Sequence, residues 1–254
     1  MNASSSSSPS NHPDAAWRHL LDAATAPYRK TGRFAWHFAR GKLGYDPVFR
    51  GLIQRGLIGA HRQRVLDIGC GQGIFASLLA SMTTMQGQGR WPADWAATPS
   101  AAAYTGIELM PRDVARAEAL VGHIAPTPRF VCGDMCRAEL PASDLVVIFD
   151  VLHYVDLDAQ EAVLRRVRDA LEPGTGRLLL RVGDMQDRRG FAISQWVDRM
   201  VTRVRGHRVS PTWGRPLADW VALLHRLGFD VQPVPMSAGT PFANVLLVAD
   251  RRAA

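Results

Sequence analysis

The sequence predicts one α/β domain whose core is a mostly parallel, seven-stranded sheet with helices on both faces. Short apolar runs alternate with helical patterns between residues 64 and 182, which is typical of parallel strands joined by crossover helices. Two more strand-like runs follow near the end of the chain with only a short loop between them, and this spacing predicts an antiparallel hairpin. A chain of 254 residues is long enough for one such core with additions.

The first part of the chain precedes the predicted sheet. Residues 1–13 are rich in serine and lack the basic start and apolar centre of a secretory signal, so we expect a disordered tail. Residues 14–63 carry apolar side chains at helical spacing, and Pro27 and Pro47 divide them into short helices. We therefore expect a helical cap at 14–63 and the main domain at 64–254.

The remaining elements follow from the apolar periodicity, taken in chain order. Strands are expected at Arg64–Gly69, Tyr104–Leu109, Arg129–Gly133, Leu145–Phe149, Arg177–Val182, Val231–Met236 and Asn244–Ala249. Helices are expected at Ile74–Met82, Arg112–Val121, Leu157–Leu171 and Ala218–Leu227. The hairpin gives the sheet one reversed strand at its edge. Two stretches, Gln86–Ala102 and Met185–Pro216, fit no core element, and insertions of this length are usually functional or disordered.

Composition and charge are those of a globular protein and disfavour a membrane-spanning, zinc-binding or haem-binding one. Hydrophobic residues make up 47% and charged residues 21% of the chain, as in ordinary globular domains, and no apolar run could span a bilayer. The three cysteines match no zinc or haem spacing, so we expect no metal site and reduced thiols in the cytoplasm. The net charge of +7 comes from many arginines, which we interpret mainly as solvated surface.

A glycine-rich turn follows the first predicted strand. In Val65–Gly73 (VLDIGCGQG), three alternate glycines let the backbone turn tightly and approach a ligand closely. A dinucleotide fold would space its glycines G-x-G-x-x-G, with an acidic residue about 20 positions later. Here the spacing is G-x-G-x-G, and Asp67 lies within the segment. The pattern therefore disfavours NAD and favours a different nucleoside.

The turn VLDIGCGQG is similar to the first motif of class I S-adenosylmethionine-dependent methyltransferases, and the likeness continues through most of Arg64–Leu180. The resemblance implies a Rossmann-like fold, S-adenosylmethionine as the cofactor and methyl transfer as the reaction. It also implies that Asp67 supports the cofactor's amino-acid end, that Glu108 accepts hydrogen bonds from the ribose hydroxyls, and that Asp134 accepts one from the adenine amino group. The cofactor-binding residues implied in this way are Asp67, Gly69, Cys70, Gly71, Gly73, Glu108, Leu109, Asp134, Met135, Asp150, Val151 and Arg40.

The acceptor side is predicted from the loop after the fourth strand and from the helical cap. Methyl transfer from a sulfonium is an in-line displacement, in which positioning and water exclusion supply much of the acceleration, so no general base is obligatory. His153 would serve as the base for a weakly acidic acceptor, or it packs at the mouth of the sheet without moving a proton. In related enzymes an N-terminal helix caps the cofactor, so Arg40 would meet the methionine carboxylate, although a solvated arginine fits the same pattern. The expected acceptor-binding residues are His37, His153, Tyr154 and Trp196.

The late insertion has the pattern of a basic, amphipathic helix. Its apolar positions are Phe191, Ile193, Trp196, Val197, Met200 and Val204, and its arginines are Arg188, Arg189, Arg199, Arg203 and Arg205. Because this segment leaves the carboxyl end of a parallel strand, we expect residues 185–216 to form a lid over the acceptor. A basic lid would suit a negatively charged substrate or an acidic acyl carrier protein.

Two other functions fit parts of the sequence. A nucleic-acid methyltransferase would account for the charge, but residues 150–153 read DVLH and lack the Asn/Asp-Pro-Pro-aromatic loop of base amino-group methylases. A binding module without turnover is disfavoured by the intact glycines, Asp67 and Glu108. The cap and the lid pattern are also faintly similar to bacterial methyltransferases of fatty-acid-like or aryl-polyene pigment pathways. We therefore expect O- or C-methylation of a small molecule, aromatic or carrier-bound, and no specific nucleic-acid partner.

Overall fold

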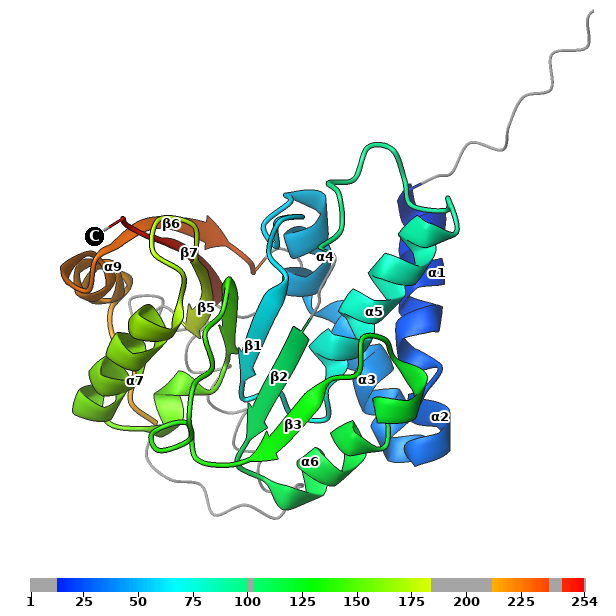
Figure 1. Cartoon of the computed structure of the whole chain (residues 1–254), viewed down its shortest axis with the longest axis horizontal. Coiled ribbons are helices and arrows are strands. Elements are labelled where there is room, and N and C mark those ends of the chain that lie inside the picture. The colour runs from blue at the N-terminus through cyan, green and yellow to red at the C-terminus, as the bar shows by residue number, and fades with distance from the viewer. Residues whose placement is uncertain (1–12, 100–102, 184–211, 238–243, 254) are drawn as a thin grey trace, which may run out of the picture.

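The computed structural model describes residues 13–99, 103–183, 212–237 and 244–253, and its centre is a seven-stranded sheet (Figure 1). The strands are β1 (Arg64–Ile68), β2 (Ala103–Glu108), β3 (Arg129–Cys132), β4 (Leu145–Phe149), β5 (Arg177–Gly183), β6 (Phe229–Pro235) and β7 (Asn244–Arg251). Their order across the sheet is β3-β2-β1-β4-β5-β7-β6. The first five strands are parallel, and β7 runs antiparallel to both of its neighbours. This confirms the α/β fold class and the terminal hairpin.

The reversed strand differs in place from the sequence prediction. It lies one position in from the edge, because β7 pairs with β5 on one side and with β6 on the other. The burial of β7 and the composition of β6 both fit this order. Residues Leu246–Ala249 of β7 are buried, as suits an interior strand, whereas β6 contains Pro233 and Pro235, which lack the N–H that an inner strand must donate.

The four helices predicted between and after the strands are present, although α5 continues five residues beyond its predicted end at Met82. The described helices are α1 (Pro13–Thr25), α2 (Tyr28–Thr31), α3 (Arg33–Tyr45), α4 (Pro47–Gln54), α5 (Ile74–Gly87), α6 (Pro111–Glu118), α7 (Leu157–Ala170) and α9 (Leu217–Arg226). The described residues also contain two short 3-10 turns, η1 (Val121–His123) and η2 (Leu152–Tyr154). No helix of the described part combines the length and the apolar character needed to cross a membrane.

Apolar side chains cover the sheet on both faces. On β4, Leu145 and Val147 join the cluster formed with α1, α3, α4 and α5, whereas Val146 and Ile148 join the cluster formed with α7 and α9. Successive residues of a strand point to opposite faces, so a strand buried on both sides is a continuous apolar run. That is the signal that LVVIF gives in the sequence.

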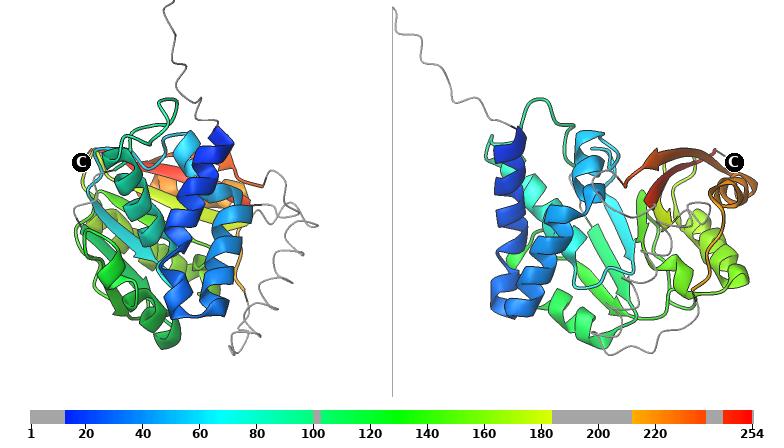
Figure 2. Two further views of the ribbon diagram at one scale, coloured as in Figure 1. Left: turned by 90° about the vertical axis from the view of Figure 1, so that its right-hand side faces the viewer. Right: turned by 180° about the vertical axis from the view of Figure 1, so that it is seen from behind.

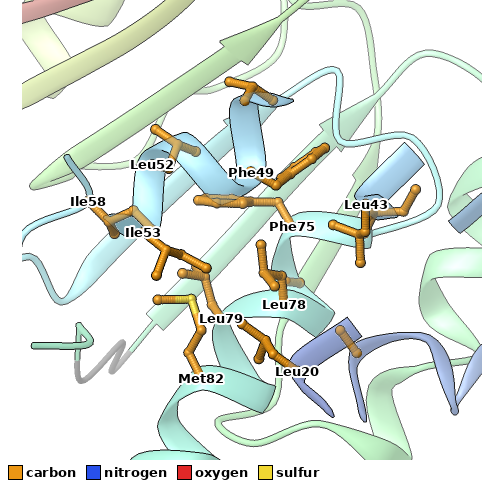
Figure 3. Packing of buried hydrophobic residues seen from close by; sticks show 14 of the residues in the cluster. Leu20, Leu43, Phe49, Leu52, Ile53, Ile58, Phe75, Leu78, Leu79 and Met82 are labelled. Atoms are coloured by element: carbon orange, nitrogen blue, oxygen red, sulfur yellow. The ribbon is translucent and has the colours of Figure 1, made fainter. Parts of the chain in front are cut away.

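The N-terminal helices extend the first of these two clusters. Helix α5 lies between α1 and the sheet, so it is covered on two sides (Figures 1 and 2). Figure 3 shows Leu20 and Leu43 in the same cluster as the α5 residues Leu78 and Met82. The cap thus shares a hydrophobic core with the sheet.

The strand order fixes where a ligand can bind. The chain runs from β1 outward to β2 and β3 on one side and then crosses to β4 and β5 on the other side of β1, so the direction of strand addition reverses at β1. In open α/β sheets, ligands bind in the crevice at the carboxyl ends of the strands beside such a switch point. The insertion after α5 lies at the amino ends instead, where Trp91 and Trp95 pack edge to face with ring centroids 5.0 Å apart.

Candidate active site

The glycine turn lies at the carboxyl end of β1, and its three glycines have different surroundings. Gly69, Gly71 and Gly73 have φ values of +78°, +55° and +76°. A Cβ added to Gly69 would overlap Val151, and one added to Gly73 would lie 2.9 Å from the Phe130 ring. A Cβ on Gly71 would meet no atom within 4 Å. Gly69 and Gly73 are therefore needed for packing, whereas Gly71 borders open space that a ligand can fill.

Glu108 ends β2 directly beside this turn. Its Oε2 accepts a hydrogen bond from the Gly71 N–H at 2.9 Å, and its Oε1 accepts one from the Met110 N–H at 2.9 Å. A carboxylate offers about four acceptor positions, so roughly two remain for hydroxyl donors. The next side chain, Leu109, is 62% exposed and adds an apolar surface at the same strand end.

Asp67 is buried beneath the turn and accepts a short hydrogen bond from the Tyr104 hydroxyl. Burial raises the pKa of Asp67 to about 7, against the lowering effect of the Tyr104 hydrogen bond, and the negative charge of Glu108 raises it further. Burial likewise raises the pKa of the Cys70 thiol. Gly106, the β2 partner of Asp67, leaves space for the Cys70 thiol, because a Cβ at residue 106 would lie 2.7 Å from Cys70 Sγ.

Asp134 and Met135 follow β3 at the same edge of the sheet. Asp134 Oδ1 accepts a hydrogen bond from the Cys136 N–H at 2.9 Å, which holds the carboxylate over its own turn. Arg166 of α7 donates to the Met135 carbonyl at 2.9 Å, and the Met135 side chain packs against the second core cluster. Both residues are half-buried and lie next to the strand that carries Glu108.

Asp150 follows β4 in a left-handed conformation, with φ +60°. Arg181 of β5 donates to both carboxylate oxygens of Asp150, from Nε at 2.7 Å and from Nη2. Lys42 Nζ of α3 adds a contact at 3.2 Å. Burial would raise the pKa of Asp150, but the positive charges of Arg181 and Lys42 outweigh it and hold that pKa well below its usual range.

His153 and Tyr154 lie on η2, just after Asp150, with ring centroids 4.2 Å apart. Burial lowers the pKa of His153, and the charge of Asp150 offsets part of that shift. The Trp213 N–H donates to the His153 carbonyl at 2.8 Å, and the Trp213 side chain is exposed. His153 and Tyr154 therefore lie beside residues 212–216, which lead into α9.

Other predicted residues lie apart from this group. Arg40 forms an ion pair with Asp22 of α1 at 2.5 Å, and His37 is exposed beside the Trp36 ring. The roles of Arg40 and His37 in binding stay predictions. Trp196 and the predicted helix of the lid, with its arginines, lie outside the described residues.

Four residues that shape the site were not predicted from the sequence, namely Tyr104, Lys42, Asp46 and Arg181. Arg181 left a usable signal, because it interrupts the apolar run LLLRV in a strand predicted to be buried. A charged residue in such a run needs a partner, and an acidic residue at the end of the neighbouring strand was available. The other three gave no local sign, since their contacts depend on how distant segments pack.

Comparisons with known proteins agree with this geometry. A family model described as a methyltransferase domain matches residues 16–234. The carboxy-S-adenosyl-L-methionine synthase of Chromohalobacter salexigens is 33% identical over 118 residues, which cover 46% of this chain and 37% of that protein. The tetracenomycin polyketide synthesis 8-O-methyl transferase of Streptomyces glaucescens is 31% identical over 112 residues, 43% of this chain and 31% of that protein. The chain thus matches only about a third of the length of these curated relatives.

Among solved structures, the magnesium protoporphyrin IX methyltransferase of Synechocystis with bound SAH has a TM-score of 0.57 and 16% identity. The match covers 94% of this chain and 100% of that one, and at this identity it shows a shared fold. The family model is the stronger finding, because it spans most of the chain, from α1 to β6. The protein therefore belongs to the methyltransferase-domain family.

Proposed function

We propose that the protein transfers a methyl group from S-adenosylmethionine to a small-molecule acceptor. One observation carries the proposal: the open side of Gly71 lies next to the Glu108 carboxylate at the carboxyl ends of neighbouring strands. This is the place and the chemistry for a nucleoside whose ribose hydroxyls need a charged acceptor. Family membership supports the same reaction, as do the names of the relatives.

The residues present fit this cofactor. Glu108 has acceptor positions left for the two ribose hydroxyls, and Gly71 leaves room for the backbone to approach the ligand. Asp67 would support the cofactor's amino-acid end, directly or through water. Asp134 would accept from the adenine amino group, with Met135 and its apolar surroundings beside the base.

When bound, the cofactor would supply a methyl group already activated by the sulfonium. The task of the chain is then to align the acceptor with that methyl group and to exclude water. The loop after β4 is suited to this task, because Val151 packs against Gly69 and so couples the acceptor side to the glycine turn. His153 follows two residues later on η2.

His153 is the proposed general base for a hydroxyl acceptor. Because burial lowers its pKa, the imidazole is neutral near pH 7 and can accept a proton. The exposed rings of Tyr154 and Trp213 on the same rim would suit a planar, aromatic acceptor. O-methylation is favoured over C-methylation by the Streptomyces relative, whose name specifies an O-methyl transfer. Delivery by an acidic acyl carrier protein is supported only by arginines outside the described residues.

A transfer assay tests the proposal. The intact protein would be incubated with S-adenosylmethionine labelled in its methyl group and a panel of phenols, carboxylic acids and nucleic acids. We expect label in at least one small molecule, and His153→Phe to slow that transfer by about a hundredfold, the lower range for general-base catalysis. The matched control is His123→Phe, which changes an exposed histidine of η1. Label in nucleic acid alone, or tight cofactor binding without transfer to any acceptor, would overturn the proposed reaction.

A further inference from the structure

Four charged side chains are connected by ion pairs between the cap and the carboxyl end of β5. Arg181, whose side chain is 1% exposed, donates to Asp150 and to Asp46 Oδ1 at 2.5 Å. Lys42 Nζ lies 2.9 Å from Asp46 Oδ2 and 3.2 Å from Asp150 Oδ2. We call these residues the charge quartet. Two positive and two negative side chains leave the charge quartet with no net charge.

Stability alone does not account for a buried arginine at this position. Removing a guanidinium from water is costly, and buried ion pairs are often no more stable than apolar residues of similar volume. The preceding residues, Leu178–Leu180, are buried leucines, and the Arg181 guanidinium lies 5.8 Å from the Phe149 ring centroid. The Arg181 side chain thus lies among apolar neighbours, and its charge is directed at the carboxylates of Asp150 and Asp46.

Asp150 is the more exposed of the two carboxylates of the charge quartet, and it lies at the carboxyl end of β4. The Asp150 side chain is 30% exposed, whereas the Asp46 carboxylate is more deeply buried and also caps α4 by accepting from the Val48 N–H at 3.1 Å. Asp150 directly precedes Val151, which contacts the glycine turn. Against the lowering by burial, the charge of Asp150 also raises the pKa of His153. Aspartate suits the left-handed backbone at this position, but it also brings a carboxylate to the carboxyl end of β4, next to the residue that contacts the glycine turn of the proposed cofactor site.

Methyl transfer destroys the positive charge of a sulfonium. A bare carboxylate beside it would stabilise the charged cofactor more than the transition state, which slows the reaction. We propose that Arg181, assisted by Lys42, is a positioning residue that neutralises Asp150, so that Asp150 shapes the turn after β4 without binding the sulfonium as its counter-ion. This inference rests on the proposed function.

The test compares a charged ligand with an uncharged one. S-adenosylmethionine carries the sulfonium, whereas its demethylated product, S-adenosylhomocysteine, has a neutral thioether at the same place. Calorimetry near pH 8 gives both dissociation constants, and their quotient measures the preference for the sulfonium. In Arg181→Met we expect this preference to rise about fivefold or more, as for a unit charge several ångströms away in a partly screened site. Arg181→Lys should restore the wild-type quotient.

Arg177→Met is the matched control, because Arg177 lies at the other end of β5 and holds Asp250 through two hydrogen bonds of 2.7 and 2.8 Å. It should leave the quotient unchanged. An unchanged quotient in folded Arg181→Met overturns the inference. If that variant does not fold, Lys42→Met replaces it, since Lys42 is 33% exposed, and a quotient that does not rise there overturns the inference as well. A wild-type protein that binds neither ligand overturns the proposed function and this inference together, whereas binding with an unmoved quotient overturns the inference alone.

Discussion

Three carboxylates at neighbouring strand ends have three different environments. Asp67 is buried with a hydroxyl partner, and its pKa is raised to about 7. Asp150 is paired with two cations, and its pKa is lowered. Glu108 accepts from two backbone N–H groups and keeps positions for a ligand. The same side-chain chemistry can therefore serve support, backbone shaping and ligand recognition, because the surroundings of a carboxyl group decide whether it is ionised.

Replacing Glu108 with alanine should weaken cofactor binding without unfolding the protein. The lost interaction is a hydrogen bond to a charged acceptor, which is worth on the order of 1.5–3 kcal/mol. Calorimetry with S-adenosylhomocysteine measures the change, and circular dichroism confirms the fold. Glu118→Ala, at an exposed position of α6, is the control. An unchanged dissociation constant in folded Glu108→Ala would refute the ribose assignment.

Asp67 should make stability depend on pH. Its pKa in the folded protein, about 7, lies above the ordinary 3.8, so the folded state binds more protons between these values. The free energy of unfolding should therefore fall as the pH rises from about 4 to about 7 and then level off. Asp67→Asn removes the titration, so urea unfolding at about pH 5 and about pH 8 should show a smaller decline than in the wild type. Equal declines would show that Asp67 titrates normally.

At the residue scale, the sequence predicted groups that belong to a local motif. Asp67, Glu108 and the glycines follow apolar strands, so their shared edge could be inferred from the parallel topology. The partner of Asp67 could not, because Tyr104 lies in the next strand and reaches Asp67 only through side-chain packing. Arg181 likewise meets Asp46 across 135 positions of sequence, a distance at which spacing carries no information.

At the scale of elements, the glycine turn combines packing with ligand binding. Gly69→Ala would force a side chain into Val151 at a positive φ, so we expect lower stability, by more than the roughly 1–3 kcal/mol of backbone strain alone. Gly71→Ala has space, so it should lose only about that strain in stability but markedly weaken cofactor binding. Thermal unfolding and calorimetry on both variants separate the two effects. Equal losses of affinity at equal stability would contradict the different roles of these glycines.

The elements themselves were largely predictable because both faces of the sheet are covered. Buried strands such as β4 are continuous apolar runs, and the short loop before β7 left only a hairpin as the connection. The order of that hairpin was not predictable from its spacing. The strand that is apolar on both faces takes the inner position in the sheet. That strand is β7, because β6 contains prolines.

For the whole molecule, the cap and the sheet share one core, so they should unfold together. Leu20 of α1 is fully buried against α5, and Leu20→Ala should lower the free energy of unfolding by about 2–5 kcal/mol. Leu109→Ala changes an exposed leucine and should change it by less than about 0.5 kcal/mol. Urea unfolding followed by tryptophan fluorescence and circular dichroism should give one coincident transition. Two separate transitions would show that the cap folds as an independent unit.

The most direct test of methyl transfer at this site is calorimetric titration of the intact wild-type protein with S-adenosylhomocysteine and, separately, with NAD. The open Gly71, the Glu108 carboxylate and the spacing of the glycine turn suit the methionine-derived nucleoside. We therefore expect saturable binding of S-adenosylhomocysteine to one site per chain and no comparable heat with NAD. Binding of NAD in preference to S-adenosylhomocysteine would contradict the assignment of the cofactor and, with it, the proposed reaction.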